Sequence, residues 1–104
     1  MGDRVSISFY NNVAESVVLF SHQDGISLVD DACRYVQQLQ EWARDVGPTN
    51  PLSRLEPATV MVDFMHGHIH CTDGGRIESN FYLGHDGHDG DNSDNGHYRI
   101  DLSP

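Results

Sequence analysis

The sequence predicts an α+β fold: a two-layer sandwich with one helix packed on one face of a mostly antiparallel sheet. Two observations lead to this prediction. One long segment has apolar residues at three- and four-residue spacing, and five short segments have the composition or the alternation of strands. Their order along the chain is β-β-α-β-β-β. A chain of 104 residues without a long linker has the size of one domain, so residues 1–104 are expected to form a single domain.

The N-terminal part predicts two strands. Residues 4–10 alternate between apolar and polar side chains, with Ser6 and Ser8 on the polar side, which indicates a half-buried strand. An Asn-Asn turn follows. Residues 15–21, "ESVVLFS", are apolar on both faces, and such a strand must be covered on both faces. The helix would cover one face. A second copy of the chain could cover the other, which predicts a homodimer.

Residues 27–46 predict the helix. Ser27 is a suitable N-cap, and Gly47 with Pro48 ends the segment. Cys33 lies on the apolar stripe, so we expect a buried thiol. The stripe consists of Leu28, Val29, Ala32, Cys33, Val36, Leu39, Trp42, Ala43 and Val46.

The C-terminal half predicts three more strands. The proline-rich segment 48–57 is a connector, and strands are expected at 58–65, 76–83 and 97–102. The last two would form a β-hairpin, with the acidic segment 85–97 as its connection.

Acidic residues dominate the composition. The chain has sixteen Asp and Glu against six basic residues, all of them Arg, and a net charge of −10. Such charge destabilises a compact state by self-repulsion, and molar salt relieves this by shortening the screening length to roughly 3 Å. We therefore expect a cytoplasmic protein of a salt-accumulating halophile. The alternative is a mesophile in which codon bias has replaced Lys by Arg.

The same composition limits the partners. Nucleic-acid binding through bulk charge is not expected, although a local Arg site stays open. The N-terminal stretch "MGDRVSISFY" lacks the charged leader and apolar run of a signal peptide. No apolar run approaches the roughly 18 residues of a membrane span, so no membrane association is expected.

The acidic stretch "HDGHDGDNSDNGHY", residues 85–98, partly matches a calcium loop. An EF-hand loop closes with a bidentate glutamate at its last position, and reading from Asp91 this position holds Leu102. The alternative is a solvated acidic turn, since Asx residues and glycine are what a turn needs. The candidate calcium ligands are Asp89, Asp91, Asp94 and Asn95.

A second candidate metal site is the stretch "HGHIHC". His66, His68 and His70 occur at every second residue, so on a continuing strand they would share one face and could chelate zinc, copper or nickel. Further histidines could approach them in space, namely His85, His88 and His97. A metal-dependent hydrolase is then possible. The chain lacks HExxH, a Walker motif and a GxSxG elbow.

The segments "ESVVLFSH", "PLSRLEPATVMVDF" and "DGDNSDNGHY" together resemble a small family of uncharacterised archaeal and viral-type proteins. The resemblance spans most of the chain and implies no activity. Because no catalytic motif is complete, the sequence favours a non-enzymatic binding or interaction module. The alternative is a divalent-metal protein that holds zinc or calcium at one of the two candidate sites.

Overall fold

A computed structural model describes residues 2–69, 74–76 and 80–103 of the chain. It confirms the α+β class, with a four-stranded sheet and two helices in place of the single helix expected. The elements in chain order are β1 (Val5–Tyr10), β2 (Val18–Ser21), α1 (Ile26–Val46), α2 (Pro57–His68), β3 (Phe81–Gly84) and β4 (His97–Asp101).

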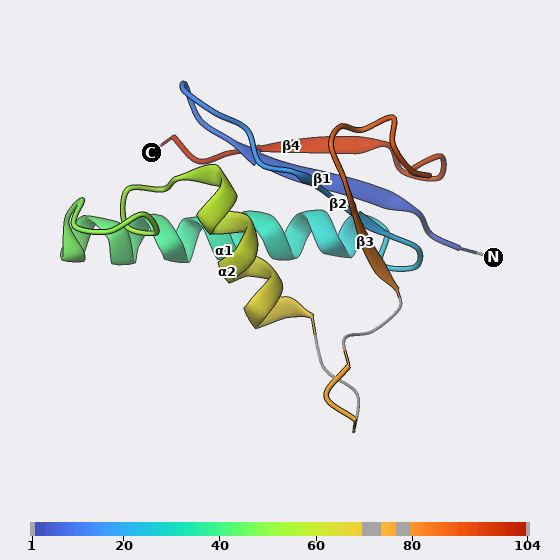
Figure 1. Cartoon of the computed structure of the whole chain (residues 1–104), viewed down its shortest axis with the longest axis horizontal. Coiled ribbons are helices and arrows are strands. Elements are labelled where there is room, and N and C mark those ends of the chain that lie inside the picture. The colour runs from blue at the N-terminus through green and yellow to red at the C-terminus, as the bar shows by residue number, and fades with distance from the viewer. Residues whose placement is uncertain (1, 70–73, 77–79, 104) are drawn as a thin grey trace.

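The sheet has the strand order β3-β2-β1-β4 (Figure 1). β1 pairs antiparallel with β2, and β2 with β3, whereas β1 and β4 are parallel. The expected mostly antiparallel sheet is thus confirmed. The expected hairpin is wrong, because β3 and β4 lie at opposite edges of the sheet. Residues 85–96, called the crossing loop below, therefore pass over β2 and β1 to reach the far edge.

Both helices cover the same face of the sheet and enclose the core (Figure 1). Phe9 in β1 contacts both of them: its ring centroid lies 6.1 Å from that of Tyr35 in α1 and 5.5 Å from that of Phe64 in α2. The buried residues of this core are Val5, Ile7, Phe9, Leu19, Leu28, Ala32, Val36, Leu39, Val60, Met61, Phe64, Ile69, Ile100 and Leu102.

The strand expected at 58–65 is wrong, because these residues belong to α2. The alternation of Val60, Val62 and Phe64 is compatible with a strand, but it hides a three- and four-residue spacing. Val60 and Phe64 are buried against the sheet, while Val62 is 67% exposed. Pro57 at the start of the helix fits that position, where a backbone N–H would have no helical partner anyway.

Replacing Gly67 by alanine tests the helical assignment. Gly67 lies in the last turn of α2, is exposed, and a Cβ built on it would meet no atom within 4 Å. Alanine is the better helix former by about 1 kcal/mol, so Gly67→Ala should raise the free energy of unfolding by roughly that amount. Urea unfolding measures the change. A loss of stability would contradict a helix at this position.

The helix α1 differs from expectation in two details. It begins at Ile26 after Gly25, without a side-chain cap, and the Ser27 hydroxyl donates instead to the Asp24 carbonyl. Cys33 is exposed, so the expectation of a buried thiol is wrong. The reason is that the apolar stripe is wider than the face that the sheet covers. The buried stripe residues are Leu28, Ala32, Val36, Leu39 and Ala43.

The crossing loop covers the face of the sheet opposite the helices. Phe20 and Val18 point to this face and are 0% and 2% exposed. Phe20 stacks on Tyr82, with ring centroids 4.9 Å apart, and both rings lie against Gly90 of the loop. β2 is therefore covered on both faces, as expected, but within one chain. The homodimer stays a prediction, which light scattering would test.

The described part of the chain contains no helix with the length and apolarity needed to span a membrane.

Candidate functional site: a polar cavity under the crossing loop

The end of the crossing loop is tied to the N-terminal segment. The backbone N–H of Arg4 donates to the Asp94 carboxylate at 2.9 Å, and the N–H of Asn95 donates to the Arg4 carbonyl at 3.0 Å. The Asn95 amide also donates to Asp3 at 2.7 Å. These bonds extend the parallel pairing of β1 and β4 and fix the end of the loop.

The other candidate calcium ligands also hold the loop together. The Asp89 carboxylate accepts the backbone N–H of Asp86, and the Asp91 carboxylate accepts that of Ser93. Hydrogen bonds from the Ser93 side chain, and then from its backbone N–H, lower the pKa of Asp91. Asp91 also pairs with Arg4, whose Nε lies 3.2 Å from its carboxylate. These carboxylates therefore cap the loop backbone.

The candidate histidines are not aligned as expected. His66 and His68 lie two residues apart on a helix, which turns them to different sides, and His70 lies outside the described residues. His66 is exposed. The His68 ring stacks on Phe64 and its Nδ1 lies 3.6 Å from the Asp31 carboxylate. His66 and His68 lie in α2 and not in the strand that would have placed their imidazoles on one face.

Within residues 2–69, 74–76 and 80–103, no group of three or more His, Cys, Asp or Glu side chains is placed to hold a metal ion. Zinc or calcium binding stays a prediction. Elemental analysis of the native protein would test it.

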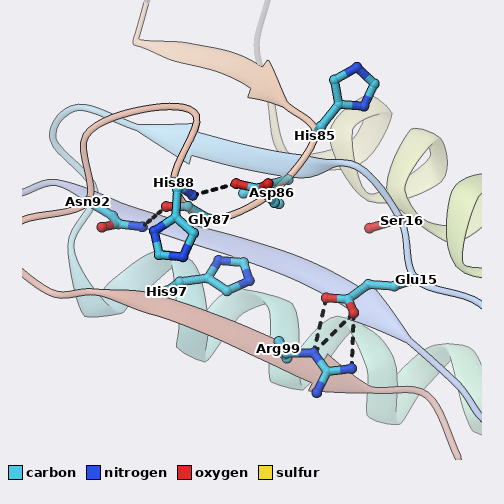
Figure 2. Close-up of a pocket in the computed structure, with 10 residues that line it drawn as sticks. Glu15, Ser16, His85, Asp86, Gly87, His88, Asn92, His97 and Arg99 are labelled. Atoms are coloured by element: carbon cyan, nitrogen blue, oxygen red, sulfur yellow. Dashed lines mark hydrogen bonds and ion pairs between the residues drawn. The ribbon is translucent and has the colours of Figure 1, made fainter.

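The crossing loop borders a cavity of about 600 Å³, open to solvent, on the face opposite the helices (Figure 2). Three segments line it: residues 15–18, which end the connection between β1 and β2 and begin β2, residues 85–92 of the loop, and β4. Figure 2 shows Glu15 and Arg99 paired at one side, while the His85 ring points away from the other labelled side chains. The lining residues are Glu15, Ser16, Val18, His85, Asp86, Gly87, His88, Asn92, His97 and Arg99.

A chain of side-chain hydrogen bonds crosses the sheet at this cavity. The Asn92 amide donates to Ser6 Oγ at 2.9 Å, and Ser6 Oγ lies 2.8 Å from Nδ1 of His97. Across the ring, Nε2 lies 3.3 Å from Ser8 Oγ, which donates to Glu15 at 2.6 Å. An amide nitrogen only donates and a carboxylate only accepts. We infer that Ser6 donates to Nδ1 and that Nε2–H donates to Ser8, since this direction satisfies every group.

Electrostatics support this arrangement at both ends. The Arg99 guanidinium donates to both Glu15 oxygens at 3.1 Å and lies 4.1 Å above the Tyr10 ring. Hydrogen bonds from Arg99, and then from Ser8, lower the pKa of the Glu15 carboxyl. Burial of the ring lowers the pKa of His97, which favours the neutral imidazole that the hydrogen bonds require.

The chain of hydrogen bonds that runs from Asn92 to Glu15 is called the relay below; its other members are Ser6, His97 and Ser8. Its serines, histidine and glutamate do not form a nucleophilic triad. Ser6 and Ser8 are 0% exposed, so neither hydroxyl can reach a bound substrate. Ser8 also directs its proton to Glu15 and not to His97, whereas a catalytic serine must give its proton to the histidine. The arrangement can fix a ring and present polar groups to a ligand.

Sequence reasoning found only part of this site. It named His85, His88 and His97 as histidines that could converge, and all three line the cavity, although with residues 15–18 and not with His66. Glu15 and Arg99 were missed, because their pairing joins segments far apart in sequence. The available signal was the pair of serines on the polar side of β1, which are small enough to let another group pack against them.

No known protein family, no curated protein and no solved structure matches this chain. The fold and the cavity therefore define it as a small α+β domain with a polar cavity on the sheet face opposite its helices.

Proposed function

We propose that the protein is a small binding module whose ligand site is the cavity under the crossing loop. One observation carries the proposal: ionisable side chains from three separate segments face a common space of about 600 Å³. Small-molecule sites are concave, fall between about 300 and 1,000 Å³, and have a few fixed polar groups. Here Glu15, His97 and Arg99 are fixed by hydrogen bonds.

A fragment screen followed by ¹H–¹⁵N NMR tests this function. The screen should contain small amines, carboxylates, polyols and nucleosides, added singly to the full chain. Saturable shifts of the backbone amides at residues 15–18, 86–92 and 97–99 are the expected result. A second groove is lined by Val13 and Pro57, and saturable shifts centred on it would show that the ligand binds there and not in the cavity under the crossing loop. A screen without saturable shifts would contradict a binding role.

We also propose, from the net charge of −10, that the domain works in the cytoplasm of a salt-accumulating organism. Because salt screens the repulsion between its carboxylates, the melting temperature should rise between 0.1 and 2 M KCl. A rise of about 5 °C corresponds to ~1 kcal/mol in a domain of this size. Sucrose of equal osmolality is the control. A melting temperature that does not respond to KCl would contradict the adaptation.

A further inference from the structure

The charges at the cavity are unevenly paired. Two carboxylates line it, those of Glu15 and Asp86. Glu15 is balanced by Arg99, whose Nη2 lies 3.0 Å from its oxygen. Asp86 accepts the backbone N–H of His88 at 2.8 Å. In the described part of the chain neither an Arg nor a His side chain lies within ion-pair distance of Asp86, so no side chain there forms an ion pair with it.

The polar floor of the cavity offers few protons to a ligand. The relay directs the hydroxyl protons of Ser6 and Ser8 along the sheet, to His97 and Glu15. Arg99 directs two of its three guanidinium nitrogens, Nε and Nη2, to Glu15. These bonds leave the Asp86 carboxylate and the His88 imidazole beside the space, and a carboxylate, which can only accept, favours a ligand that donates hydrogen bonds and carries positive charge.

We propose that the cavity binds a small organic cation through a primary ammonium group, with Asp86 as the counter-ion. This inference rests on the proposed binding function. An ammonium group supplies three donors and one positive charge, which match the Asp86 carboxylate, whose hydrogen-bond partner at the cavity is the neutral backbone N–H of His88. The net charge of −10 adds a long-range attraction for any cation. That attraction is non-specific, so the test must separate it from binding at Asp86.

Three probes with the same carbon chain and different head groups distinguish the ligand classes. They are butylammonium chloride, sodium butyrate and butan-1-ol, each titrated into the ¹⁵N-labelled full chain at pH 8 in 0.15 M NaCl. At this pH an imidazole carries little charge. We expect the amides of Gly87, Asn92 and Arg99 to shift saturably with butylammonium only.

A matched pair of variants separates local from long-range charge. Asp86→Asn keeps the oxygen that accepts the His88 N–H and removes the charge, so butylammonium should bind about three- to fivefold more weakly, as expected for an exposed ion pair. Asp45→Asn removes the same charge from an exposed position on α1 and should leave the affinity unchanged. Equal losses in both variants would overturn the role of Asp86.

The probe series also separates the two proposals. Saturation by butyrate or butan-1-ol instead of butylammonium would overturn the cation inference and leave a binding cavity. If none of the three probes nor any screened fragment shifts the cavity amides, the proposed function fails together with it.

Discussion

Replacing Phe20 by alanine should destabilise the fold by about 3–5 kcal/mol, the cost typical of a fully buried phenylalanine. Phe20 is 0% exposed although it points away from the helices. Its ring stacks on Tyr82 at an interplanar angle of 5°. A Cβ at Gly84 in β3 or at Gly90 in the loop would lie 2.8 or 2.9 Å from this ring, so the backbone packs directly on it at both places. The loss should appear in urea unfolding monitored by circular dichroism.

Val17→Ala is the matched control, because Val17 precedes the same strand and is 43% exposed. It should cost less than about 1 kcal/mol, since the truncation removes few methyl groups and a large part of this side chain stays in water. The cost of Phe20→Ala should also be the same at low and high protein concentration, because the chain itself covers the ring. A cost below 1 kcal/mol, or one that grows with concentration, would indicate that the loop does not cover this face.

The sequence predicted the elements whose pattern is local. The apolar stripe of α1 and the alternation in β1 and β4 each follow from side-chain spacing within one segment, and the structure confirms them. α2 was misread because a short apolar run fits a strand and a buried helix equally well. Val60, Met61 and Phe64 show the helical spacing only once it is known which residues are buried.

The position of β4 could not be derived from local pattern. Consecutive strands usually pair, which favoured a hairpin between β3 and β4. In the structure β4 pairs with β1, across most of the length of the chain. The acidic loop therefore does not join neighbouring strands at a sheet edge, although its aspartates are solvent-exposed as expected. Its Asx side chains cap its own backbone and that of Arg4, and Gly90 allows it to lie close to Phe20.

Replacing His97 by leucine should destabilise the fold by about 1–3 kcal/mol, the cost of leaving a buried polar group without its partner. Leucine keeps much of the volume of the ring but accepts no hydrogen bond. The hydroxyl of Ser6, which is 0% exposed, would lose the acceptor that lies 2.8 Å away. His66→Leu is the control, because His66 is exposed on α2 and its replacement should have little effect.

A double-mutant cycle shows whether the cost comes from the relay. In Ser6→Ala with His97→Leu, the hydroxyl and its acceptor are both removed, so no unpaired hydroxyl remains. The Asn92 amide keeps its other acceptor, the Gly87 carbonyl at 2.9 Å. The double variant should therefore cost less than the sum of the single variants by about 1 kcal/mol. Additive costs would contradict a hydrogen bond between Ser6 and His97.

The pH dependence of stability gives a second readout of the same relay. Burial lowers the pKa of His97 in the folded state below its usual 6.5, so below that pH the unfolded chain binds the proton more readily. The stability linked to His97 is thus complete above pH 6.5 and is lost as the pH falls towards the folded pKa. A second loss follows below about pH 4.5, where the lowered pKa of Glu15 acts in the same direction.

Urea unfolding of wild type and His97→Leu between pH 8 and 4 separates the two contributions. The first loss should disappear in the variant, since it has no imidazole at this position, whereas the second should remain. The cost of the substitution should therefore shrink as the pH falls from 7 to 5. A cost that stays constant over this range would mean that the proton on His97 does not affect folding, and that the ring is held by packing alone.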